Sequence, residues 1–195
     1  MSSRSARYAL LSRMFSYPDA DLLSELPRLA RQAQWSGRLP SENQSLPDLE
    51  AAYTGLFINR LGGVASPPYG SAYLDEEGGL MGESCRDVEA AYRGCALVPG
   101  SGSEPADALA TELEFMFFLT DKEEVLRQRG EDEAADELRG QQEAFWQKLL
   151  SPWLAPFCRR LLKEKPLCDF YQSAALRLLE LQSDEDGRLG GTSEN

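Results

Sequence analysis

Histidine is absent from this sequence of 195 residues. It is the commonest general base near neutral pH, the usual base of hydrolase triads and the commonest ligand of transition metals. Its absence argues against triad hydrolases and zinc enzymes, although chemistry based on carboxylates or lysines stays possible. We therefore expect no bound metal ion.

Long apolar runs are absent too. A membrane-spanning helix needs roughly 18–20 apolar residues in succession, and no run approaches that length. At the N-terminus, Arg4, Arg7 and Arg13 interrupt the apolar pattern that a secretory signal would need. The sequence therefore predicts a cytoplasmic protein that does not insert into membranes.

Basic residues are few relative to acidic ones. The 20 Lys and Arg residues are outnumbered by 32 Asp and Glu residues, which gives a formal net charge of −12. Such a surface repels phosphate backbones, so we do not expect nucleic acid as a partner. It attracts cationic partners, although acidity can also serve solubility alone.

Cysteines are too few and too widely spaced for a metal knuckle. The four are Cys85, Cys95, Cys158 and Cys168, and no two are separated by only two residues. In a cytoplasmic chain we expect reduced, partly buried thiols. The sequence also lacks the glycine-rich loop that cradles phosphates in nucleotide-binding proteins, so we expect no tightly bound cofactor.

What the sequence does contain is helical periodicity. Apolar residues recur at three-and-four spacing along most of the chain, and no segment alternates as a strand would. This predicts an all-α fold, a single-domain helical bundle of roughly eight to ten helices over residues 1–182. We expect the helices over residues 3–17, 19–34, 47–60, 81–94, 104–129, 131–150, 152–165 and 167–181.

Prolines and polar stretches suggest where helices are interrupted. Pro27 is expected to kink or split its helix, in which Leu23 points inward, and Pro152 is expected to restart the chain into a new helix. Residues 36–45 read as a loop. Residues 183–195 are polar and glycine-rich, so we expect a flexible C-terminal tail.

Residues 62–79 differ from the rest because Pro67 and Pro68 prevent a continuous helix while Tyr69 and Tyr73 make the segment aromatic. Long irregular segments in compact domains are often functional. The composition leaves two interpretations open, a binding loop and a packed connector.

The segment that begins at Glu104 is the most informative. Pro105 is placed for the first position of a long helix, and Asp107 would lie in its first turn. Six of the seven residues in 113–119 are apolar, so this helix should lie at the centre of the bundle. We expect its acidic first turn at a surface or cleft, where the carboxylates either bind a ligand or only stabilise the helix start.

Three motifs together make the chain similar to the TorD/DmsD family of cytoplasmic chaperones, which mature molybdenum-containing redox enzymes. They occur in the family's order and near its usual spacing, and the resemblance covers residues 8–181. The motifs are Tyr53-Thr-Gly-Leu56-Phe57 followed by Pro68-Tyr69-Gly70-Ser71-Ala72-Tyr73-Leu74, then Glu104-Pro105-x-Asp107-x-Leu109-x-x-Glu112-Leu113-Glu114-Phe115-Met116, and Phe145-x4-Leu150-x-Pro152-Trp153-x3-Phe157.

Three positions depart from the family pattern. Ala108 and Leu149 stand where the family usually has histidine, and Gly70 stands where it usually has glutamate. Where those side chains contribute to peptide binding, the contribution is missing or moved. The aspartate of the second motif is retained as Asp107.

The resemblance implies a system-specific chaperone that is not an enzyme. It would bind the twin-arginine signal peptide, the body, or both, of a molybdenum-containing oxidoreductase catalytic subunit, assist cofactor insertion and delay export. Carboxylates could pair with the arginines, and tyrosines could contact the apolar part or make cation–π contacts. The candidate binding residues are Tyr53, Tyr69, Ser71, Tyr73, Glu104, Asp107 and Glu112. The client's identity stays open.

The family includes domain-swapped dimers, and residues 97–103 could form a hinge, so monomer and homodimer both stay open. A carboxylate metal enzyme is disfavoured because Glu112 and Glu114, two residues apart, point to different helix faces. A helical adaptor or regulator unrelated to redox maturation is the alternative.

Overall fold

The computed structural model describes residues 1–35, 44–59, 63–64, 66–75, 82–97 and 104–189. Within these ranges the chain is helical, apart from connecting segments and one isolated antiparallel bridge, which confirms the all-α prediction. The α-helices are α1 (Ser3–Phe15), α2 (Leu22–Gln32), α3 (Leu46–Tyr53), α4 (Ser71–Leu74), α5 (Glu83–Gly94), α6 (Leu109–Gln128), α7 (Asp132–Phe145), α8 (Ser151–Leu161) and α9 (Asp169–Leu189), and the π-helical turns are η1 (Thr54–Ile58) and η2 (Trp146–Leu150).

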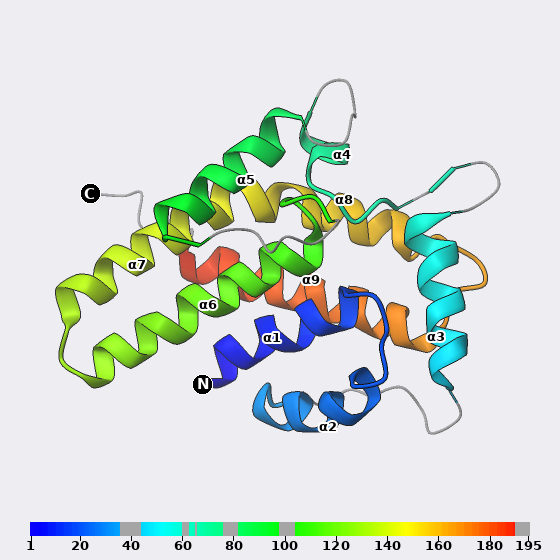
Figure 1. Ribbon diagram of the computed structural model, residues 1–195, viewed down its shortest axis with the longest axis horizontal. Coiled ribbons are helices and arrows are strands. Elements are labelled where there is room, and N and C mark those ends of the chain that lie inside the picture. Colours follow the sequence, from blue (N-terminus) through cyan, green and yellow to red (C-terminus); the bar gives the residue numbers. More distant parts are fainter. Residues whose placement is uncertain (36–43, 60–62, 65, 76–81, 98–103, 190–195) are drawn as a thin grey trace.

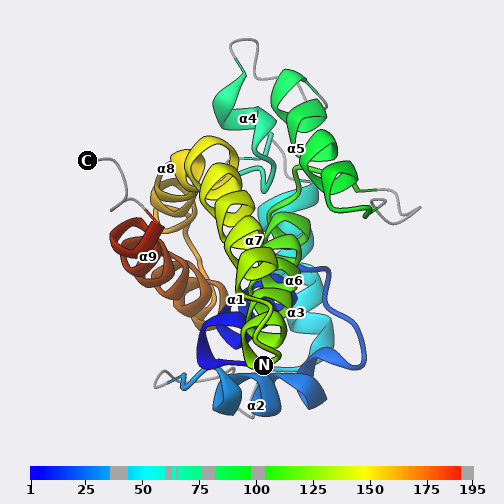
Figure 2. The same ribbon diagram turned by 90° about the vertical axis from the view of Figure 1, so that its left-hand side faces the viewer.

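Helices α1 and α6 pack against each other at the centre of the bundle (Figure 1). Helices α5 and α9 lie on opposite sides of α7 and α8, and α2 and α5 lie at opposite ends of the molecule (Figure 2). The core is rich in aromatic side chains that meet edge to face, such as Phe15 with Phe157 at 5.6 Å and Phe57 with Tyr171 at 5.3 Å between ring centroids. No helix within the described ranges combines the length and apolar character that a bilayer crossing requires.

The expected break at Pro152 is wrong, because α7, η2 and α8 follow one another without a gap. Proline cannot donate to the carbonyl four residues earlier, which here is that of Lys148. The wider π-helical turn ends two residues before Pro152, and the Ser151 N–H closes it on the Trp146 carbonyl. The change in winding accommodates the proline inside one long helical rod.

Pro27 does not split its helix either. Helix α2 runs through it. Because proline has no N–H, the Leu23 carbonyl four residues earlier lacks its helical hydrogen-bond donor. Leu23 was expected to point inward, but it is 38% exposed, so water can replace the missing donor. The inward positions are Leu22, Leu26 and Leu29, as expected.

The predicted tail is partly wrong, because α9 continues to Leu189. The polar composition of residues 183–195 predicted a flexible tail, but contacts with the rest of the protein hold the last two turns of α9 in place. The Trp146 Nε1–H donates to Asp186 at 2.7 Å, the Gln147 Nε2–H donates to the Leu189 carbonyl at 2.8 Å, and the Leu189 side chain is buried. Residues 190–195 lie outside the described part, as do 36–43 and 98–103, which include most of the expected loop and hinge.

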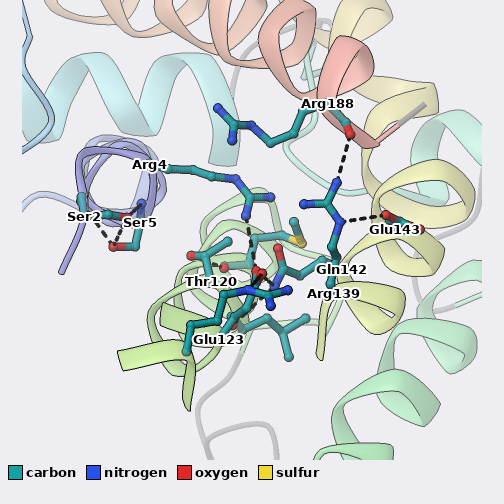
Figure 3. Close-up of polar contacts among 12 residues, drawn as sticks. Ser2, Arg4, Ser5, Thr120, Glu123, Arg139, Gln142, Glu143 and Arg188 are labelled. Atoms are coloured by element: carbon teal, nitrogen blue, oxygen red, sulfur yellow. Dashed lines mark hydrogen bonds and ion pairs between the residues drawn. The ribbon is translucent and has the colours of Figure 1, made fainter. Parts of the chain in front are cut away.

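A buried polar network joins the N-terminus of α1 to three other helices. The Arg4 guanidinium donates to both carboxylate oxygens of Glu185 in α9 at 2.6–3.1 Å, and Glu185 is 1% exposed. Arg4 also lies 3.7 Å from Glu123 of α6, whose carboxylate accepts from Gln142 of α7 at 2.8 Å (Figure 3). The same view shows Arg139 bonded to Glu143 and to the Arg188 carbonyl.

Breaking this network at Glu185 should be costly, because Arg4 would be left without its main partner in a mostly buried place. We expect Glu185→Ala to lower the free energy of unfolding by about 3–5 kcal/mol. Asp184→Ala, which removes the more exposed pair with Arg7, should cost no more than about 1 kcal/mol. Urea unfolding of both variants tests this, and equal losses would contradict it.

Candidate functional site

The segment before α6 is not helical, which corrects the prediction that Pro105 opens the helix. Helix α6 begins at Leu109, so Asp107 precedes its first turn. The Leu109 N–H donates to the Pro68 carbonyl at 2.9 Å, and the Gly70 N–H donates to the Asp107 carbonyl at 3.0 Å. These two bonds pair the segment with the proline- and tyrosine-rich loop and keep it out of the helix.

Asp107 ties these two segments together through its side chain as well. Its Oδ2 accepts the backbone N–H of Ser71 at 2.7 Å, and both residues are completely buried. Ser71 is the first residue of α4, so the carboxylate satisfies a donor that the helix start leaves free. The sequence placed Asp107 at a surface or cleft, and the structure places it inside the protein.

Glu112, another candidate binding residue, is also completely buried. Its Oε2 accepts from the Trp153 indole N–H at 3.3 Å. Gly70 packs against both, because a Cβ added there would lie 3.2 Å from Trp153 Nε1 and 3.3 Å from Glu112 Oε1. The glycine that departs from the family motif is therefore the residue that lets the loop approach this carboxyl.

The buried Glu112 differs from an ordinary acid in its electrostatics. Burial raises the pKa of Glu112 well above its usual range, and the nearby charge of Asp107 raises it further, while the Trp153 hydrogen bond acts in the opposite direction. Among the described atoms, Asp107 Oδ1, Glu112 Oε1 and Ser71 Oγ have no hydrogen-bond partner. Glu112 therefore holds its proton to a higher pH in the folded protein than in the unfolded chain.

The accessible part of the site lies around Glu104, which is exposed, although partial burial of its carboxyl raises its pKa. Tyr69 and Tyr53 lie within electrostatic range of it. Burial and then the charge of Glu104 raise the pKa of both hydroxyls. Tyr17 is 48% exposed and its ring packs on Tyr53 at 5.3 Å. Tyr53 itself is buried at 3% exposed, so the accessible residues are Glu104, Tyr69 and Tyr17, and we name these three the Glu104 rim.

Tyr73 belongs to a different environment. Its ring stacks on Trp153 at 5.5 Å, and the Arg160 guanidinium lies 4.7 Å from its centroid. A cation of the chain itself thus already occupies a face of Tyr73. Burial raises the pKa of its hydroxyl to about 12.

The predicted site residues thus fall into three groups. Asp107, Ser71 and Glu112 are together in the interior, Glu104 and Tyr69 form the rim with Tyr17 beside the buried Tyr53, and Tyr73 faces α8. Sequence reasoning did not select Tyr17, Arg160 or Trp153 as site residues. Trp153 was part of the third motif, and its indole N–H, which must find a partner when buried, was the available signal. No group of three or more cysteine and carboxylate side chains among the described residues is placed to hold a metal ion.

Comparison with known proteins supports the resemblance carried by the motifs. The model of the family described as Nitrate reductase delta subunit matches residues 18–159. Two proteins described as Chaperone protein TorD, from Vibrio vulnificus strains YJ016 and CMCP6, are 31% and 30% identical over 138 residues. Those alignments cover 70% of this chain and 62% of each relative, so the chain matches less than two thirds of their length.

The fold also matches a solved structure. A crystal structure of a candidate redox enzyme maturation protein from Archaeoglobus fulgidus superimposes with a TM-score of 0.62 over 93% of each chain, at 22% identity. At that identity the match shows the shared fold alone. The family match and the TorD relatives confirm the predicted resemblance to TorD-like proteins.

The raised pKa of Glu112 predicts how stability depends on pH. Above about pH 4.3 the unfolded chain releases this proton while the folded chain keeps it, so stability falls by up to about 1.4 kcal/mol per pH unit until the folded-state pKa is reached. Glu112→Gln removes this loss and still accepts from Trp153. The variant should therefore gain stability over the parent protein progressively as the pH rises above about 4.3 in thermal unfolding, and a gap independent of pH would contradict the assignment.

Proposed function

The chain belongs to the Nitrate reductase delta subunit family, and we propose that it is a maturation chaperone for the catalytic subunit of a molybdenum-containing oxidoreductase. It performs no catalysis and acts in the cytoplasm by holding the client while the cofactor is inserted, which delays export. The similarity to proteins described as TorD chaperones supports this role.

The Glu104 rim is the proposed contact for the client's twin-arginine signal peptide. Glu104 is an exposed carboxylate that makes no ion pair with any described residue. A guanidinium can pair with such a carboxylate through two hydrogen bonds, and the tyrosines beside it can contact the cation or the apolar side chains that follow. An unpaired acid flanked by tyrosines is the observation that carries the proposal.

The buried carboxyls have a positioning role in this proposal. Asp107 holds the start of α4 and keeps Tyr69 beside Glu104. Neither Asp107 nor Glu112 is exposed, so neither can touch a peptide while the fold is closed. The peptide therefore depends on Asp107 indirectly, through the placement of the loop.

Calorimetric titration with the twin-arginine leader peptides of the molybdoenzymes of the same cell tests the proposal. Glu104→Gln should weaken binding of the matching leader at least about tenfold because the charge-assisted pair is lost. A leader with both arginines replaced by lysines should bind more weakly to the parent protein, since lysine cannot pair through two hydrogen bonds.

The matched control is Asp107→Asn, which keeps an acceptor for the Ser71 N–H and removes the charge. Its affinity for the leader should equal that of the parent protein within about twofold. Failure of every leader and every mature catalytic subunit to bind would favour an adaptor unrelated to redox maturation. A larger loss of affinity for Asp107→Asn than for Glu104→Gln would indicate that the arginines bind at Asp107 in the interior and not at Glu104.

A further inference from the structure

The end of α8 is a basic surface on an acidic chain. Arg159, Arg160, Lys163 and Lys165 fall within seven residues and are all exposed, whereas the chain as a whole carries a formal net charge of −12. The turn that joins α8 to α9 lies at the edge of the molecule (Figure 1). We name these four residues the α8 basic patch.

The charge of the patch is not neutralised locally. None of the four cations makes an ion pair with a residue that the structure describes. The carboxylates in the same stretch are Glu164 and Asp169, so residues 159–169 hold four cations against two carboxylates. Glu164 is half-buried while the cations are exposed, and the surface of the turn therefore stays positive.

The helix end accounts for only part of this pattern. Cations in the last turn of a helix stabilise its negative end, and Arg159 and Arg160 lie there. Lys163 and Lys165 lie beyond Leu161, the last residue of α8, where that effect fades. Helix stabilisation thus does not explain why two further lysines extend the patch.

One member of the patch is held in place beside the candidate site. The Arg160 guanidinium lies 4.7 Å from the centroid of the Tyr73 ring, which stacks on the buried Trp153 at 5.5 Å. Tyr73 belongs to α4, and Tyr69 of the Glu104 rim lies two residues before that helix begins. The patch therefore borders the loop that contributes to the rim, and the two surfaces have opposite charge.

We propose that the α8 basic patch binds an acidic segment of the client protein, which deepens the proposed function and rests on it. Guanidinium and ammonium groups pair with carboxylates through charge-assisted hydrogen bonds. Arg159 and Lys163 are about 6 Å apart along the helix axis. Side chains on one face of an extended segment repeat at about 6.6 Å, so alternate carboxylates of such a segment meet both cations.

The net charge of the chain decides between a protein segment and larger anionic surfaces. A charge of −12 repels an anionic membrane or a phosphate backbone, because either would extend past the patch and face the acidic remainder of the surface. A short acidic segment contacts the patch alone. Its carboxylates therefore gain the attraction of the four cations with less of that repulsion.

Fluorescence anisotropy with a labelled peptide of about eight residues that alternates glutamate with serine tests the proposal. A peptide with glutamine in place of each glutamate is its control. The acidic peptide should bind the parent protein at low salt and dissociate at high salt, and the neutral peptide should not bind. The double variant Arg159→Glu/Lys163→Glu should weaken binding at least about tenfold, because two attractive contacts become repulsive.

Arg28→Glu/Arg31→Glu is the matched variant, because both arginines are exposed on α2 and the net charge changes by the same amount. Its affinity for the acidic peptide should equal that of the parent protein within about twofold. Equal losses in the two double variants, or no binding of the acidic peptide at low salt, would overturn the proposal. Patch-dependent binding of vesicles of phosphatidylglycerol and phosphatidylcholine without peptide binding would overturn it too, and would assign the patch to a lipid surface.

The twin-arginine leader separates this inference from the proposed function. Arg159→Glu/Lys163→Glu should still bind the leader, because the variant leaves Glu104 and the tyrosines beside it unchanged. Leader binding without binding of the acidic peptide would reject the patch alone. Binding of the acidic peptide without any leader binding would count against the Glu104 rim and leave the patch assignment standing.

Discussion

The contact between Asp107 and the start of α4 is the constraint on which the candidate site depends. The buried Asp107 Oδ2 accepts the Ser71 N–H, and two backbone hydrogen bonds pair residues 107–109 with residues 68–70. Through this contact, segments about 40 residues apart act as one rigid unit. That unit sets where α6 begins, places Tyr69 beside Glu104, and brings Gly70 against Glu112 and Trp153.

The helical architecture followed from the sequence because apolar spacing is a local signal. Three-and-four spacing over residues 3–17 and the nearly continuous apolar stretch at 113–119 predicted two buried helices, and Tyr8, Leu11, Leu113 and Met116 are buried in them. Proline effects were harder to predict, because a π-helical turn before Pro152 accommodates what the local rule treats as a break. Such adjustments depend on the packing of the whole rod.

The acidic residues show why the site was only partly predictable. Sequence reasoning treats a carboxylate as a surface group unless a partner is visible, yet Asp107, Glu112, Glu123 and Glu185 are all buried. Their partners come from distant parts of the chain, such as Arg4 for Glu185 and Trp153 for Glu112. The family motifs drew attention to Asp107, and the structure shows that Asp107 makes a buried structural contact whereas Glu104 is exposed.

Chemical-shift mapping by NMR during titration with a twin-arginine leader tests the central claim most directly. We expect the perturbed resonances to gather at Glu104, Tyr69 and Tyr17, while the Ser71 amide stays protected from hydrogen exchange because Asp107 still holds it. Rapid exchange at Ser71 in the free protein, or perturbations centred on the Arg4–Glu185 end, would contradict the account.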